Sequence, residues 1–78
     1  MDTNFIISLD SIADVNAFAN TIAHFKSEID LSSGRYIVNA KSIMGIFSLD
    51  LTRPLTLTVH CKDELEEISS AIAPYLKK

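Results

Sequence analysis

Residues 38–51 read VNAKSIMGIFSLDL, and the order of residue types in this stretch decides the local fold. An alternating segment, residues 35–40, leads into it and predicts a strand. The residues on one face of that strand are Tyr36, Val38 and Ala40. Ser42 follows, and serine is a strong N-cap residue, so we expect a short helix to begin there. Pro54 then breaks the chain, because proline lacks a backbone donor.

Immediately upstream, residues 28–32 predict a second strand that pairs with the first. Ile29 and Leu31 alternate with polar residues, which is typical of a strand with one buried face. Ser33 and Gly34 lie between the two strands, and glycine readily adopts the positive φ of a tight turn. The pattern therefore predicts a β-hairpin.

Further toward the N-terminus, residues 4–9 (NFIISL) predict a strand, followed by a helix that begins at Ser11. The inward-facing residues of the strand are expected to be Phe5, Ile7 and Leu9. Asp14 lies three residues after Ser11, which resembles a capping box with Asp in place of Glu. Apolar residues then recur at three- and four-residue steps and form one helical stripe. These residues are Ile12, Val15, Phe18, Ala19, Ile22 and Phe25.

On the C-terminal side, residues 55–61 alternate as a fourth strand, and a helix follows. The inward residues of the strand are Leu55, Leu57, Val59 and Cys61. Asp63 is expected to cap the helix, and Lys77 and Lys78 suit the negative end of its dipole. Pro74 predicts a kink or an early end. The apolar stripe comprises Leu65, Ile68, Ile72, Tyr75 and Leu76.

The order strand, helix, strand, strand, helix, strand, helix predicts an α+β fold. We expect one domain over residues 1–78, an open-faced β-sandwich with a four-stranded antiparallel sheet and helices on one face. The opposite face would be polar and hydrated. Its predicted members are Ser8, Asp30, Ser32, Asn39, Thr56, Thr58 and His60.

Length and charge exclude several function classes. The 78 residues carry a net charge of −3 and are 47% hydrophobic, so a second domain does not fit and disorder is not expected. The basic residues are scattered, which argues against nucleic acid and anionic membranes as partners. The apolar run Phe5–Ile7 is too short for a signal peptide or a membrane span. Cys61 is the only cysteine, so we expect no internal disulfide and a cytoplasmic location.

The stretch 38–51 resembles the HPr family, the histidine phosphocarrier of the sugar phosphotransferase system. In Gram-positive members the matching stretch typically reads VNLKSIMGVMSLGI. The resemblance is clearest over residues 41–49, and the element order is also that of the family. It implies that Ser42 is a regulatory phosphorylation site, modified by the HPr kinase. It also implies that Ile43, Met44 and Phe47 contact partners. The apolar residues of the short helix cannot all face one thin core, and we expect ordinary core packing for Ile46 and Leu49.

The sequence departs from the family where the phosphoryl group is carried. Family members have a loop reading G-[IL]-H-A-R-P between the first strand and the first helix. Here the same place, residues 9–14, reads LDSIAD, with no His, Arg or Pro. Asp10 and Asp14 stand there instead, and their charge would repel a phosphoryl donor. The resemblance therefore implies a member that lacks the usual phosphocarrier histidine.

Other residues are weak candidates for the missing chemistry. His24 lies off the helical stripe, and His60 falls on the solvent face of the fourth strand. Neither precedes a helix N-terminus, where an anion is best stabilised. An aspartyl phosphate on Asp10 or Asp14 is disfavoured because no metal-binding acidic cluster accompanies it. Cys61 is expected to be a small buried hydrophobe.

Three functional hypotheses remain open at this point. The first is a regulatory or adaptor module, for which the resemblance offers Crh as a precedent. Crh-like action of this chain would mean that it binds a catabolite-control transcription factor when Ser42 is phosphorylated. The second is a phosphoryl carrier with a non-standard acceptor. The third is a structural interaction protein unrelated to sugar uptake, a monomer or weak homodimer through Ile43–Phe47. No nucleophile–base pair or metal-ligand spacing is visible, so we expect no enzyme activity, cofactor or metal.

Overall fold

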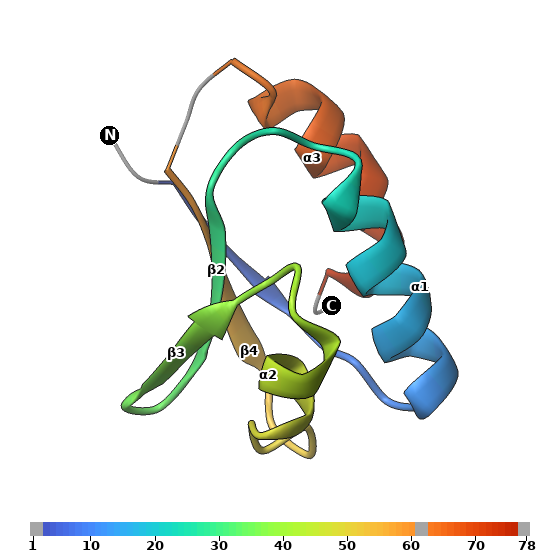
Figure 1. Cartoon of the computed structure of the whole chain (residues 1–78), viewed down its shortest axis with the longest axis vertical. Helices are drawn as coiled ribbons and strands as arrows, with labels where there is room; N and C mark the ends of the chain where they lie inside the picture. Colours follow the sequence, from blue (N-terminus) through green and yellow to red (C-terminus); the bar gives the residue numbers. More distant parts are fainter. Residues whose placement is uncertain (1–2, 61–62, 77–78) are drawn as a thin grey trace.

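The computed structural model describes residues 3–60 and 63–76, which form a four-stranded antiparallel sheet with helices packed on it (Figure 1). The elements are β1 (Thr3–Ile7), α1 (Ile12–Ala23), β2 (Ile29–Ser33), β3 (Tyr36–Asn39), α2 (Ile43–Phe47), β4 (Leu55–Val59), α3 (Leu65–Ile72) and the 3₁₀ helix η1 (Ala73–Tyr75). The predicted α+β class and the predicted element order are confirmed.

The order of the strands across the sheet is β1-β4-β2-β3, and every neighbouring pair is antiparallel. The register aligns residues from all four strands into one apolar row, which consists of Phe5, Leu57, Leu31 and Val38. Side chains of directly opposed residues share a face, so each strand contributes its alternate apolar residues to the same layer. The predicted strand alternation therefore holds across the sheet.

The helices cover this apolar face and bury the core between them and the sheet. In Figure 1, α1 and α3 lie side by side over the sheet. Phe18 of α1 is fully buried and meets the ring of Tyr75 edge-on, with centroids 5.6 Å apart. The fully or nearly buried core residues include Val15, Ala19, Ile22, Ile46, Leu49, Ile68 and Ile72. The core positions predicted for Ile46 and Leu49 are confirmed.

The other face of the sheet is mainly polar, as predicted, although the exposed side chains of Ile6 and Ile37 also lie on it. Asp30 lies opposite both Thr58 and Asn39, and Ser32 lies opposite Thr56. The Thr58 hydroxyl donates to the side-chain oxygen of Asn4 at 2.8 Å. These pairs satisfy polar groups across strands, so this face needs no covering layer.

Three predicted inward residues are exposed instead, and one of them is Leu76, which follows η1 and is 36% exposed. Ile12 is 69% exposed, because the buried stripe of α1 begins one turn later, at Val15. Tyr36 is 73% exposed, although it lies on the same face of the sheet as Val38. It stands beside the hairpin turn on the edge strand β3.

Contacts between distant segments set the ends of the strands. The prediction extended the first strand to Leu9, but β1 ends at Ile7. The Ser8 amide donates to the Tyr75 carbonyl at 2.8 Å, and Leu76 forms an isolated bridge with Ile7. Likewise β4 ends at Val59, and Cys61 lies outside the described residues.

The prediction that Asp63 caps the last helix was wrong. The N-cap position of α3 is Glu64, and its side chain makes no capping bond to the helix, because it binds the loop before β2. The early end expected from Pro74 is confirmed, since α3 stops at Ile72 and continues as the 3₁₀ turn η1. Lys77 and Lys78 lie outside the described residues.

Candidate functional site at the start of helix α2

Ser42 caps helix α2, as the sequence predicts. Its hydroxyl accepts a hydrogen bond from the Gly45 amide at 3.1 Å, and its carbonyl accepts from the Ile46 amide at 2.9 Å. The Ser42 amide donates to the Asn39 carbonyl at 2.9 Å, which turns the chain sharply out of β3. The serine remains solvent-exposed, so its hydroxyl is accessible while it caps the helix.

Gly45 allows this close arrangement. A Cβ atom at this position would lie 3.2 Å from the Ser42 hydroxyl oxygen and 3.2 Å from Cβ of Val38. Either distance is tighter than an ordinary carbon contact. Glycine therefore lets the first turn of α2 pack against both its cap and the preceding strand.

The two sides of α2 differ in burial. Ile46 is fully buried, whereas Met44 is 82% exposed and Phe47 is 40% exposed. Ile43 is half-buried between these extremes. The exposed pair places a flexible thioether beside an aromatic ring, which suits an adaptable contact with another protein.

The loop after α2 is held by its own polar groups. Asp50 accepts hydrogen bonds from the Thr52 hydroxyl at 2.5 Å and from the Thr52 amide at 3.1 Å. These bonds, with the hydroxyl first, hold the pKa of the Asp50 carboxyl below its ordinary value. Arg53 lies 3.6 Å from the same carboxylate and assists. The loop therefore begins with a defined turn shortly after the end of α2.

The junction between β1 and α1 is built in a similar way but is acidic. Ser11 caps α1, with its hydroxyl accepting from the Asp14 amide at 3.1 Å, as predicted. The Asp14 carboxylate in turn accepts from the Asp10 amide at 3.2 Å. The second bond reaches the residue before the cap, a variation on the usual capping box. Two carboxylates thus surround this helix start.

The histidines lie away from both helix starts. His24 is the exposed C-cap residue of α1. His60 follows β4, and its Nε2 lies 2.6 Å from the Asp30 carboxylate across the polar face of the sheet. This pair was not predicted, although both residues were assigned to the same sheet face. Only the order of the strands brings them together.

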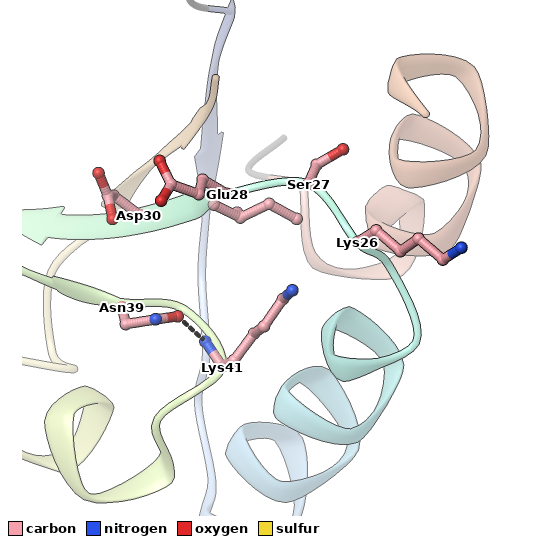
Figure 2. Close-up of a pocket in the computed structure, with 7 residues that line it drawn as sticks. Lys26, Ser27, Glu28, Asp30, Asn39 and Lys41 are labelled. Atoms are coloured by element: carbon pink, nitrogen blue, oxygen red, sulfur yellow. Dashed lines mark hydrogen bonds between the residues drawn. The ribbon is translucent and has the colours of Figure 1, made fainter. Parts of the chain in front are cut away.

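A polar pocket of about 170 Å³ lies where β2 begins and β3 ends (Figure 2). The lining residues are Lys26, Ser27, Glu28, Ile29, Asp30, Asn39 and Lys41. The ammonium of Lys41 donates to the Phe25 carbonyl at 2.6 Å, and the Lys41 amide donates to the Asn39 side chain at 2.8 Å. Within the described residues every buried side-chain polar atom has a partner. The pocket therefore offers no unsatisfied buried group to a ligand.

Glu64 ties the loop between α1 and β2 to the start of α3. One of its carboxylate oxygens accepts three bonds at 2.8 Å, from the Lys26 amide, the Ser27 amide and the Ser27 hydroxyl. The hydroxyl bond, followed by the amide bonds, lowers the pKa of the Glu64 carboxyl despite partial desolvation. No local pattern predicts this contact, because Ser27 and Lys26 lie 37 and 38 residues from Glu64 along the chain.

Two further findings concern the described part of the chain. No group of three or more His, Cys, Asp or Glu side chains comes together there in a way that could hold a metal ion. None of its helices combines the length and apolarity needed to cross a membrane.

Comparisons with known proteins give the family. Residues 14–78 match the family model described as the PTS HPr component phosphorylation site. HPr-C-His from Thermoanaerobacter tengcongensis is 30% identical, with a TM-score of 0.74 over 95% of this chain and 88% of that one. The phosphocarrier protein HPr from Bacillus anthracis is 28% identical, with a TM-score of 0.70 over 99% and 96% of the two chains. Curated protein sequences include no significant match.

These matches, together with the sheet order and the capped short helix, define a component of the phosphotransferase system. The chain belongs to the HPr family, whose members include phosphocarrier proteins. The family match begins at residue 14, within the first turn of α1, and residues 9–13, which precede it, read LDSIA.

Proposed function

We propose that this chain is a regulatory or adaptor member of the HPr family, controlled by phosphorylation of Ser42. It would act in the cytoplasm as a single domain, residues 1–78, without enzyme activity of its own. The observation that carries the proposal is the geometry of Ser42, an exposed cap hydroxyl beside the exposed side chains of Met44 and Phe47.

The surroundings of Ser42 favour a phosphate group. The first turn of α2 contains no acidic residue, and the Gly45 amide already points at the Ser42 oxygen. A phosphate dianion at a helix N-terminus is stabilised by about 0.3–1 kcal/mol by the dipole, and it accepts additional amide hydrogen bonds. Phosphorylation would therefore change the charge of this surface without unfolding the helix.

The β1–α1 junction supports a role other than phosphate carriage on the usual histidine. The loop contains no histidine, and Asp10 and Asp14 lie at the helix start where a phosphoryl group would need positive charge. His24 and His60 lie elsewhere, at the far end of α1 and on the polar sheet face. A regulatory role needs only the serine and the apolar contact.

The proposed partners are the HPr kinase, which would modify Ser42, and a catabolite-control transcription factor, which would bind the modified form. Ile43, Met44 and Phe47 would form the contact surface, with Met44 and Phe47 as its exposed part. Aromatic and flexible apolar groups at the centre of a small interface commonly contribute most of its binding energy.

Incubation with HPr kinase and ATP, followed by mass spectrometry, tests the proposal. We expect one phosphate on Ser42 in the wild type and in S11A, and none in S42A. S11A is the matched control, because Ser11 is the other serine that caps a helix with the same 3.1 Å bond. A wild-type chain without phosphate on Ser42 would contradict the regulatory function.

A second assay tests the lost carrier function. Enzyme I and labelled phosphoenolpyruvate should leave the chain unlabelled, whereas an HPr protein with its histidine becomes labelled in the same mixture. An acid-labile label on this chain would show that a non-standard residue accepts the phosphoryl group.

A further inference from the structure

The two edge strands of the sheet, β1 and β3, differ in their contacts with the rest of the described chain. At the β1 edge, the C-terminal segment contacts the end of the strand, through the Ser8–Tyr75 bond of 2.8 Å and the bridge between Ile7 and Leu76. At the other edge, β3 pairs only with β2 among the strands of residues 3–60 and 63–76. Figure 1 shows β3 at the outer margin of the molecule with no described element beyond it.

The hairpin geometry tells which backbone groups point outward from β3. Gly34 and Arg35 form a two-residue loop between the opposed residues Ser33 and Tyr36, and Gly34 has φ of +60°. Such a loop is closed by a hydrogen-bonded pair, and the pairs then alternate along the ladder. The Ala40 amide donates to the Ile29 carbonyl at 2.9 Å, as this alternation requires. The amide and carbonyl of Ile37 therefore face away from β2.

The side chains of β3 leave this edge accessible. Ile37 is 68% exposed and Tyr36 is 73% exposed, on opposite faces of the strand. The strand, YIVN, contains no charged residue and no proline, which are common protections of edge strands. It is protected only by its length of four residues.

We propose that β3 pairs with β3 of a second copy of this chain, antiparallel and around a two-fold axis at Ile37. The two Ile37 residues would exchange both of their outward backbone bonds, and their side chains would meet on the polar face of the sheets. Tyr36 would then oppose Val38, and Arg35 would oppose Asn39. This register sets no two like charges against each other, so the edge is self-complementary.

The dimer is a weak one that forms at high concentration. One short strand pair covers far less than the roughly 1,600 Å² of a typical stable interface, so we expect a dissociation constant on the order of 1 mM. Met44 and Phe47 belong to α2, so neither residue takes part in the proposed β3–β3 ladder.

Sedimentation velocity between about 10 µM and about 2 mM, a range that brackets the expected dissociation constant, tests the proposal. The wild type should shift toward a dimer across this range, I37K should remain monomeric, and M44K should behave like the wild type. Ile37 and Met44 are both exposed, so each variant should fold, which circular dichroism checks. A monomeric wild type, or loss of the dimer in M44K alone, would overturn the proposal.

A cysteine trap tests the register independently of affinity. In a C61S background, I37C should form a disulfide-linked dimer, because residues opposed in a hydrogen-bonded pair have Cα atoms about 5.5 Å apart. Y36C is the matched control, since Tyr36 is at least as exposed but lies off the proposed axis. Equal or greater cross-linking of Y36C would show random collision and contradict the two-fold pairing.

Discussion

The two junctions that lead from a strand into a helix are built alike. Residues 11–15 read SIADV and residues 42–46 read SIMGI. In each, a serine hydroxyl accepts the amide three residues on at 3.1 Å, and the fifth residue, Val15 or Ile46, is fully buried. In each, the serine carbonyl also accepts the amide of that fifth residue, at 3.1 and 2.9 Å. Helices α1 and α2 therefore begin with the same local hydrogen bonds and the same buried fifth residue.

The junctions differ in the fourth residue and in charge. Asp14 binds back to the Asp10 amide, so the start of α1 already holds carboxylates. Gly45 holds no charge and brings the α2 turn against Val38. An N-cap serine alone therefore does not make an anion-binding site. The charge around it decides whether a phosphate is tolerated.

The largest effect on stability is expected from the buried side of α2, and it shows whether α2 packs into the core on that side only. I46A should destabilise the fold by about 2–5 kcal/mol, because it leaves a cavity in the core. M44A should change stability by less than about 0.5 kcal/mol, as is usual for an exposed residue. Urea unfolding followed by circular dichroism measures both. A comparable cost for the two variants would mean that Met44 also packs in the core.

The two caps should contribute equally to stability. S11A and S42A should each cost about 1 kcal/mol, since each removes one hydrogen bond to an otherwise unpaired helix amide. Glycine substitutions, S11G and S42G, should cost only a few tenths of a kcal/mol relative to serine. A cost for S42A well below that of S11A would show that the short helix does not depend on its cap.

A smaller effect separates the junctions by charge. Aspartate caps a helix about as well as serine, so S42D should leave stability unchanged within about 0.5 kcal/mol. S11D adds a third carboxylate near Asp10 and Asp14 and should destabilise by up to about 1 kcal/mol at low salt. Thermal unfolding at low salt and in about 1 M salt, where the screening length falls to roughly 3 Å, measures the change in stability of each variant. Equal effects of both variants at low salt would refute the electrostatic difference.

The smallest effect on stability is expected after the C-terminal end of α1. There the Glu64 carboxylate accepts hydrogen bonds from the loop residues Lys26 and Ser27. The pKa of Glu64 is lowered from its ordinary value of 4.5, so its stabilisation is complete above pH 4.5 and is lost as pH falls through the folded-state pKa. E64Q should therefore flatten the loss of stability below that pH. Urea midpoints measured from neutral to acidic pH show this, with E66Q on the same helix as the control. An unchanged profile in E64Q would exclude Glu64 as a source of acid sensitivity.

Most of the fold could be predicted because its signals are local. The alternation at Ile29 and Leu31, the turn at Gly34 and the caps at Ser11 and Ser42 each depend on residues within one or two turns of chain. Ile46 was expected in the core and is buried, whereas Met44, which the family resemblance assigned to a partner surface, is exposed.

The errors share a cause, which is that local spacing does not say where a neighbouring element ends. Ile12 and Tyr36 fit apolar stripes but extend past the covering layer, and both are exposed. Asp63 fits a capping pattern, but the contact with the distant loop at Ser27 uses Glu64 instead. Each outcome depends on segments far apart in the chain, whose approach no local pattern records.

Residue patterns in the chain were enough to predict the four strands and the starts of α1 and α2, because short-range sterics and hydrogen bonds specify these features. The resemblance of residues 41–49 to the HPr family was also visible in the chain alone. The pairing of Asp30 with His60 and the Glu64 contacts came only from the tertiary structure. So did the contrast between a β1 edge contacted at its end by the C-terminal segment and an accessible β3 edge. These depend on the order of the strands in the sheet, which brings distant residues together after the local elements have formed.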